Sequence, residues 1–199
     1  MNQLTRIWVY LSRLHHSLGF GIQSPTDYAF VRYVINEHWQ YYAYQQLDKQ
    51  DDNWLRRKLG RLYFRLANWR QPSVMQRDEY EEYWSAGCRK TKLVDETGHI
   101  ELARLPLSGN YRESMQDIYN KVDGQSVLVI EGLWRDWDFW HEVERDVRTG
   151  VTFDLYYCGI VFFDKKRHKM NYKVNLINIF FYYYIILLKI KNKMVKIYY

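Results

Sequence analysis

Cysteine is scarce in this chain of 199 residues. Only Cys88 and Cys158 are present, and their spacing matches no metal-binding or disulfide pattern. We therefore expect two reduced, partly buried thiols, as in a cytosolic protein. Residues 1–6 also lack the charged region, the long apolar core and the small-residue cleavage site of a secretory signal. Both absences predict a cytoplasmic location.

The body of the chain also lacks a large basic surplus. The net charge is +6, but residues 176–199 hold four lysines and no acid, which leaves +2 for residues 1–175. No RNA-binding or zinc-finger motif is present, so we exclude nucleic acid as a partner. No combination of Ser, His and Asp or of Cys and His has the spacing of a nucleophilic site, so the catalytic residues are unknown. His15 and His16 point about 100° apart on an expected helix, and we expect no metal site.

The C-terminal segment 176–199 lacks glycine, alanine, proline, arginine and both acidic residues. It uses eight residue types, and all except valine have codons made mainly of A and T. We interpret the segment as read-through into AT-rich sequence after a lost stop codon or a frameshift. The alternative is membrane association through residues 176–188, an apolar run of 13 residues. That run is shorter than the roughly 20 residues of a spanning helix, although the lysines and tyrosines around it suit an interfacial segment.

Residues 1–70 have the apolar periodicity of an N-terminal helical lead-in. We expect helices at 4–18 and 54–69, and between them a helix that begins near Ser24 and continues through residue 47. The predicted buried residues of the middle helix are Tyr28, Val31, Ile35 and Trp39. In the helix at 54–69, Tyr63 and the leucines at 55, 59, 62 and 66 are predicted to face inward and the arginines outward.

After residue 70 the pattern changes to short β-prone runs that alternate with helical stretches. The expected strands are at 74–75, 92–94, 100–105, 126–130, 151–157 and 159–163. The expected helices are at 79–86, 111–122 and 136–147, the last with Trp137 and Trp140 packed on the sheet. The basic run 165–169 is expected to be a solvated turn. This alternation predicts a compact α/β domain over residues 71–175, with a largely parallel sheet and a C-terminal antiparallel hairpin.

Glycine is missing from the turn that joins the first expected strand to its helix. In a dinucleotide or adenosine site this turn is rich in glycine, because backbone N–H groups must approach the ligand closely. Here residues 76–84 hold four carboxylates instead, those of Asp78, Glu79, Glu81 and Glu82. These side chains would obstruct the approach, repel a ligand carboxylate and resist desolvation.

Two groups of segments together carry a resemblance to a known family. The first group is 19–25, 41–44 and 58–68, near the start, and the second is 126–131 and 153–163, near the end. The first group resembles the helical lead-in, and the second the last three strands, of class I S-adenosylmethionine-dependent methyltransferases of Bacteroides-type bacteria. The resemblance covers residues 1–175. It implies a Rossmann-like methyltransferase sheet, shortened here, and a natural chain that ends close to Asn175.

The same resemblance places the cofactor residues and shows which are missing. The family's acid and Gly-x-Gly-like turn fall on residues 76–80 and are lost, whereas the acid that binds the ribose hydroxyls would be Asp95 or Glu96. The stretch from Glu96 to Tyr111 is too short for the usual helix, strand, helix and strand. The acidic pair after the family's fifth strand is reduced to Glu131.

We therefore expect a methyltransferase-like pseudoenzyme that has lost cofactor binding and catalysis. It would be retained as a structural or interaction scaffold for an unidentified protein partner. The alternative is an active S-adenosylmethionine-dependent methyltransferase that acts on a small molecule and holds the ribose with Glu96. A third hypothesis is a protein held at a membrane surface by its tail.

Overall fold

The computed structural model describes residues 3–19 and 21–176. The expected read-through tail and its membrane contact therefore lie outside the described residues, apart from Leu176, which is buried. Within the described residues, no helix is both long and apolar enough to cross a membrane.

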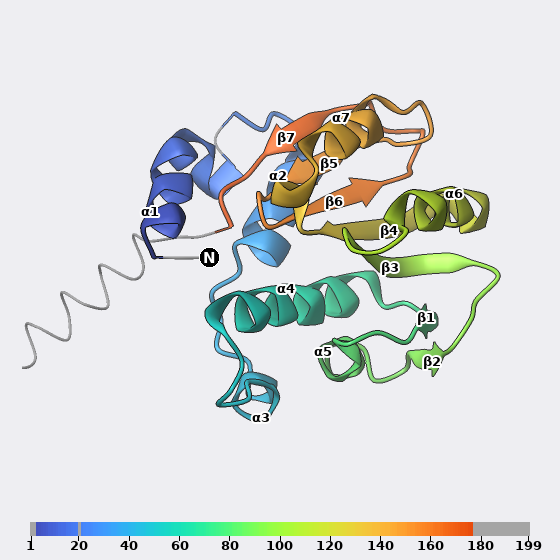
Figure 1. The fold of residues 1–199 in the computed structure, drawn as a ribbon, viewed down its shortest axis with the longest axis horizontal. Helices are drawn as coiled ribbons and strands as arrows, with labels where there is room; N and C mark the ends of the chain where they lie inside the picture. Colours follow the sequence, from blue (N-terminus) through green and yellow to red (C-terminus); the bar gives the residue numbers. More distant parts are fainter. Residues whose placement is uncertain (1–2, 20, 177–199) are drawn as a thin grey trace, which may run out of the picture.

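The first third of the described chain is helical (Figure 1). Its elements are α1 (Gln3–Ser12), the 3-10 helix η1 (Leu14–Gly19), α2 (Pro25–Phe30), the π-helical turn η2 (Val31–Ile35), α3 (Ala43–Leu47) and α4 (Trp54–Arg70). Ser24 caps α2 by accepting a hydrogen bond from the Asp27 N–H at 3.3 Å. Asn53 caps α4 in the same way at 2.9 Å. The helices expected at 4–18 and 54–69 are confirmed, although the first changes to a 3-10 helix at Leu14.

The middle helix is shorter than its periodicity predicts. Its helical backbone ends at Ile35, and Trp39 and Tyr28 are 76% and 43% exposed, so the prediction that both are buried is wrong. The prediction that every arginine of α4 points outward is also wrong. Arg65 is buried, and its guanidinium donates hydrogen bonds to the carbonyl oxygens of Val34 and Ile35 at 2.6 and 3.1 Å. Because the guanidinium satisfies these carbonyls, the helix can end there instead of continuing.

The rest of the described chain alternates strands and helices, as predicted. The strands are β1 (Val74–Gln76), β2 (Lys92–Val94), β3 (Ile100–Pro106), β4 (Val122–Glu131), β5 (Thr152–Asp154), β6 (Cys158–Phe162) and β7 (Asn171–Lys173). The helices are α5 (Glu81–Gly87), α6 (Tyr111–Lys121), the 3-10 turn η3 (Leu133–Arg135) and α7 (Trp137–Arg145). The strand expected at 151–157 stops at Asp154, because Tyr156 adopts a left-handed conformation (φ 70°) in the turn to β6. The short polar strand β7 is not predicted by its sequence.

The strands form two sheets, and their pairing is mostly parallel. β1 and β2 pair in parallel as a two-stranded sheet that lies beside β3 through β1, and the other five strands form a sheet in the order β3-β4-β6-β5-β7. β3 is parallel to β4, and β5 to β7, whereas β6 runs antiparallel to both of its neighbours. The expected α/β class and the antiparallel hairpin of β5 and β6 are confirmed.

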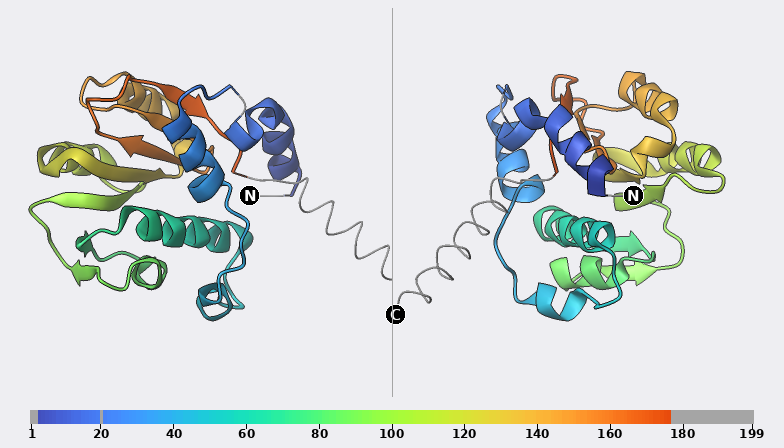
Figure 2. Two further views of the ribbon diagram at one scale, coloured as in Figure 1. Left: turned by 180° about the vertical axis from the view of Figure 1, so that it is seen from behind. Right: turned by 60° about the vertical axis from the view of Figure 1, so that its left-hand side comes forward.

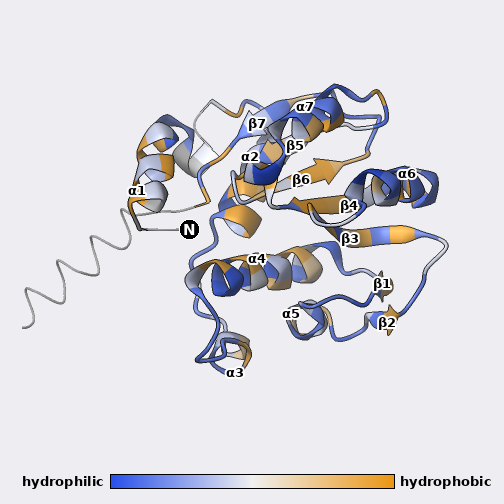
Figure 3. Cartoon of the chain, viewed as in Figure 1, coloured by the Kyte–Doolittle hydropathy of each residue, from blue (hydrophilic) through white to orange (hydrophobic). Residues whose placement is uncertain are grey.

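Helices cover both faces of the five-stranded sheet (Figure 2). Val127 and Val129 of β4 belong to the core shared with α2, η2 and α4, whereas Leu128 and Ile130 belong to the core under α6 and α7. Successive side chains of a strand point to opposite faces, so a strand covered on both faces is apolar throughout. The hydrophobic colouring of β4 and β6 reflects this (Figure 3). The apolar run of β4 ends at Glu131, so the charged side chain of this residue lies at the end of the strand.

Helix α7 approaches β6 closely at one point. Trp140 is fully buried, and a Cβ added to Gly159 would lie 2.3 Å from a carbon of its ring. The predicted packing of Trp140 on the sheet is confirmed, and only glycine leaves room for the indole at that position of β6.

Candidate functional site

The ends of three strands bring four charged side chains together. Asp78 and Glu79 follow β1, Arg104 lies near the end of β3, and Glu131 is the last residue of β4. The Arg104 guanidinium contacts all three carboxylates: Nε lies 2.9 Å from Asp78, Nη2 2.7 Å from Glu79 and Nη1 3.1 Å from Glu131. Only 5% of the Arg104 side chain is exposed. We call these four residues the Arg104 cluster.

Two tyrosines enclose the Arg104 cluster. Tyr63 of α4 is buried and donates a hydrogen bond to the Glu131 carboxylate at 2.5 Å. The Tyr80 ring faces the Arg104 guanidinium, which lies 4.9 Å from the ring centroid. The guanidinium is therefore bound through its nitrogens to carboxylates and through its flat face to an aromatic ring, as suits a buried arginine.

The turn after β1 is organised by the side chain of Asp78. Its Oδ1 accepts hydrogen bonds from the backbone N–H of Tyr80 at 2.7 Å and from the indole N–H of Trp84 at 3.0 Å. Trp84 is fully buried and stacks on Tyr63. A glycine-rich turn would leave its backbone N–H groups for a ligand. Here a carboxylate of the chain itself takes one of them.

The electrostatics of the Arg104 cluster keep it charged and closed. Burial alone lowers the pKa of Arg104, but the Glu131 carboxylate, Tyr63 and Asp78 hold it above its usual value. Burial raises the pKa of Glu131, against the lowering by the Tyr63 hydroxyl and by Arg104. Burial, followed by the Glu131 charge, raises the pKa of Tyr63. Arg104 thus stays a cation and Tyr63 stays a hydrogen-bond donor at physiological pH.

The structure does not bring Asp95 and Glu96 to the Arg104 cluster. Both residues are exposed, and the Asp95 side chain, at 97% exposure, contacts only Arg77 among the described residues, at 3.5 Å. Glu81 and Glu82 also point to the surface, where each pairs with a basic side chain. Of the acids singled out in the sequence, the fold gathers Asp78, Glu79 and Glu131.

Sequence reasoning places Tyr63 in the core but misses that Tyr63 and Arg104 hold this site together. The available signal is Arg104 itself, a charged residue within the otherwise largely apolar run expected as the strand at 100–105. The expectation that the turn carboxylates resist desolvation needs correction for Asp78, whose side chain is 18% exposed, because Arg104 neutralises it. Tyr63 has no comparable signal, since it follows the ordinary core periodicity of α4.

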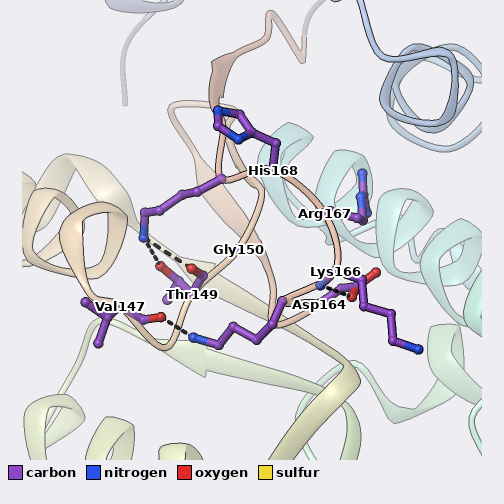
Figure 4. A pocket seen from close by; sticks show the side chains of 9 residues that line it. Val147, Thr149, Gly150, Asp164, Lys166, Arg167 and His168 are labelled. Atoms are coloured by element: carbon purple, nitrogen blue, oxygen red, sulfur yellow. Dashed lines mark hydrogen bonds between the residues drawn. The ribbon is translucent and has the colours of Figure 1, made fainter.

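A concave region lies beside the basic run 165–169 (Figure 4). This cavity of about 500 Å³ is lined by Val147, Thr149, Gly150, Asp164 and residues 165–169. The Lys169 ammonium donates hydrogen bonds to the Thr149 hydroxyl and carbonyl at 2.8 and 3.2 Å, and the Lys165 ammonium bonds the Val147 carbonyl. Arg167 pairs with a buried carboxylate of α2. The prediction of a solvated turn holds for Lys165, Lys166 and His168, which are exposed, whereas Arg167 and Lys169 are partly buried and bind other parts of the chain.

Within the described residues, no group of three or more His, Cys, Asp and Glu side chains is arranged to hold a metal ion. The rings of His15 and His16 meet edge to face, 5.8 Å apart. Comparisons with protein-family models, with curated proteins and with solved structures find no match for this chain. Its function must therefore be argued from its own residues.

Proposed function

We propose that this chain is a methyltransferase-like protein that neither binds a cofactor nor catalyses a reaction, and that it serves as a structural or interaction scaffold. The five-stranded sheet supports the methyltransferase-like part of this proposal. Strand β6 runs antiparallel to its neighbours β4 and β5, and the sequence resemblance implies such an antiparallel hairpin strand.

The observation that carries the proposal is the position of the Arg104 cluster. In open α/β sheets, ligands bind beyond the carboxyl ends of the strands, where the chain connects neighbouring strands in opposite directions. β1 pairs with β2 and lies beside β3 without backbone pairing, so the corresponding place here is beside β1 and β3. The Arg104 cluster fills it with side chains that bind one another.

S-adenosylmethionine does not fit these residues. The turn after β1 has no glycine, and Asp78 occupies the N–H of Tyr80. The acids that would hold the ribose, Asp95 and Glu96, lie exposed at the surface. Making room for adenosine would separate Arg104 from largely buried carboxylates, a loss of several kcal/mol. The site is better suited to holding strand ends together than to binding a nucleoside.

Exposed aromatic residues support the scaffold part of the proposal. Tyr33 of η2 is 70% exposed, and Trp39 and Tyr42, in the segment that leads to α3, are 76% and 91% exposed. Tyrosine and tryptophan are enriched in protein interfaces, because their rings bury a large area on binding. These residues are the first place to seek a contact with a protein partner.

Calorimetric titration of the full chain with S-adenosylmethionine, and separately with S-adenosylhomocysteine, tests the loss of cofactor binding. We expect no saturable heat at micromolar to millimolar ligand, because the Arg104 cluster would have to open first. Circular dichroism of the same sample shows that the protein is folded.

Saturable micromolar binding of either compound would contradict the proposal. If Glu96→Gln then weakened that binding while Asp95→Asn did not, the result would support the alternative, an active methyltransferase in which Glu96 binds the ribose. These two residues form a matched pair, since both are exposed acids at the end of β2.

A further inference from the structure

Helix α1 lies at the periphery of the molecule and exposes an apolar side (Figure 1). Leu4, Ile7, Trp8 and Leu11 are all exposed, Trp8 at 67%. Their spacing of three and four residues places them on one side of the helix. Single exposed apolar side chains are common, but several that gather in one place mark an interaction surface.

The opposite side of α1 is fixed to the protein. Val9 and Tyr10 are buried, and Val9 belongs to the main hydrophobic core. Just after the helix, the Arg13 guanidinium donates hydrogen bonds to the Asp154 carboxylate at 2.7 Å and to the Asp154 carbonyl at 3.0 Å. A surface helix normally has a polar side opposite its buried one. Because α1 is apolar on both sides, its exposed side calls for a second apolar environment.

The charges of the chain are divided unevenly between its ends and its middle. All 23 acidic residues lie between Asp27 and Asp164. Residues 1–26 hold two basic residues and residues 165–199 hold nine, so these ends carry +11 and the rest of the chain −5. Such an asymmetry is typical of proteins that bind an anionic surface.

The fold brings the two ends of the described chain together beside α1. The Asn175 backbone N–H donates to the His16 carbonyl at 3.1 Å, and its side chain donates to the Tyr10 carbonyl at 3.3 Å. Residues 177–199, with four lysines and no acid, follow directly in the sequence. Exposed Lys173 of β7 is also close, since its charge helps to lower the pKa of His16, after burial, His15 and Arg13. The apolar side of α1 therefore lies in a basic part of the molecule.

We propose that α1 is a membrane-surface helix, which binds the interface of an anionic lipid bilayer with Leu4, Ile7, Trp8 and Leu11. Its 10 residues span about 15 Å, so it lies along the surface and does not cross the bilayer. The tryptophan ring sits at the level of the headgroups, and the aliphatic side chains enter the acyl boundary. The basic chain ends attract the lipid phosphates.

A lipid surface matches both the apolar side of α1 and the charge around it. A nucleic acid would match the charge, but it binds mainly through phosphates, sugars and polar base edges. A second copy of the chain would match the apolar side, but it would bring two basic regions together. The proposal assigns the apolar contact to a helix that the fold holds in place, unlike contact through residues 176–188 alone. It does not depend on the loss of cofactor binding.

Cosedimentation of the full chain with lipid vesicles tests this surface. We expect binding to vesicles of phosphatidylcholine mixed with phosphatidylglycerol, much weaker binding to pure phosphatidylcholine, and a loss of binding at high salt. Trp8→Ser is expected to weaken binding to the mixed vesicles about tenfold, because it removes a large apolar side chain from the contact. Circular dichroism shows that the variant is folded.

Trp39→Ser is the matched control. Trp39 is also an exposed tryptophan, at 76%, but it belongs to the segment that leads to α3. This variant should bind the vesicles as the natural chain does. Vesicles with brominated acyl chains add a direct readout, because bromine quenches a tryptophan that enters the bilayer. Trp8→Phe should keep most of the binding and lose most of the quenching, whereas Trp39→Phe should change neither.

Four results would overturn the proposal. They are an absence of vesicle binding, equal binding to neutral and anionic vesicles, binding that Trp8→Ser leaves unchanged, and quenching that survives Trp8→Phe. Sedimentation of the free protein distinguishes the remaining occupant. A dimer that Trp8→Ser dissociates, in a chain that does not bind vesicles, would assign the apolar side of α1 to a second copy instead.

Discussion

Replacing Arg104 by alanine is expected to lower the free energy of unfolding by about 3 to 5 kcal/mol. The change leaves Asp78 and Glu131 without their cation, and each of these carboxylate side chains is only 18% exposed. Breaking a buried ion pair from one side is costly because the remaining charge has lost both its partner and its water. Urea denaturation followed by circular dichroism measures the loss.

Arg77→Ala is the matched control for this experiment. Arg77 also lies between β1 and α5 and also contacts two acids, Glu81 and Asp95, but its side chain is 52% exposed. We expect a loss of less than about 1 kcal/mol, as is usual for surface ion pairs. Combining Arg104→Ala with Glu131→Gln should recover part of the stability, since one unpaired charge is removed. Equal losses for the two arginine variants would mean that the Arg104 cluster does not hold the strand ends together.

Replacing Trp140 by alanine is expected to cost about 3 to 5 kcal/mol, the range for removal of a large buried side chain. The indole fills the space between α7 and Gly159 of β6. Because Trp140 is fully buried, its removal leaves a cavity in the core. Thermal and urea unfolding of the full chain measure the change.

Trp140→Phe separates packing from hydrogen bonding. The Trp140 indole N–H is buried and finds no hydrogen-bond acceptor among the described residues. A phenylalanine keeps a ring in the same space and removes this unsatisfied donor, so we expect less than half the loss seen with alanine. Trp137→Ala, on the same helix but only half-buried, should also cost less. A loss with phenylalanine as large as that with alanine would contradict this account.

The local pattern of the sequence predicts most of the elements. The leucines of α4 at positions 59, 62 and 66 are fully buried, as their helical spacing indicates. The antiparallel pairing of β5 and β6 follows from their tight connection. Errors arise where a distant residue intervenes. Trp39 has helical spacing, yet it is exposed because Arg65 satisfies the carbonyls at the end of η2.

The candidate site is predicted in part. The missing glycines and the acids at 78 and 79 mark an unusual turn, and both acids belong to the Arg104 cluster. Asp95 and Glu96 lie at the surface, outside the Arg104 cluster. They were predicted as cofactor residues from the family resemblance, and no local pattern in the sequence indicates which residues they contact. The partner of the turn acids is on β3, 26 residues beyond Asp78. No periodicity within either segment indicates that these two charges meet.

The sequence alone determined most of the helices and strands, the buried leucines of α4, and the absence of a glycine-rich turn after β1. Each of these depends on residues within a few positions of one another, where backbone geometry fixes which side chains share a face. Only the tertiary structure decided that four carboxylates crowded after β1 are not left to repel one another. Two of them, with Glu131, are neutralised by one buried arginine from β3, because packing the strands side by side brings together charges that are far apart in the chain.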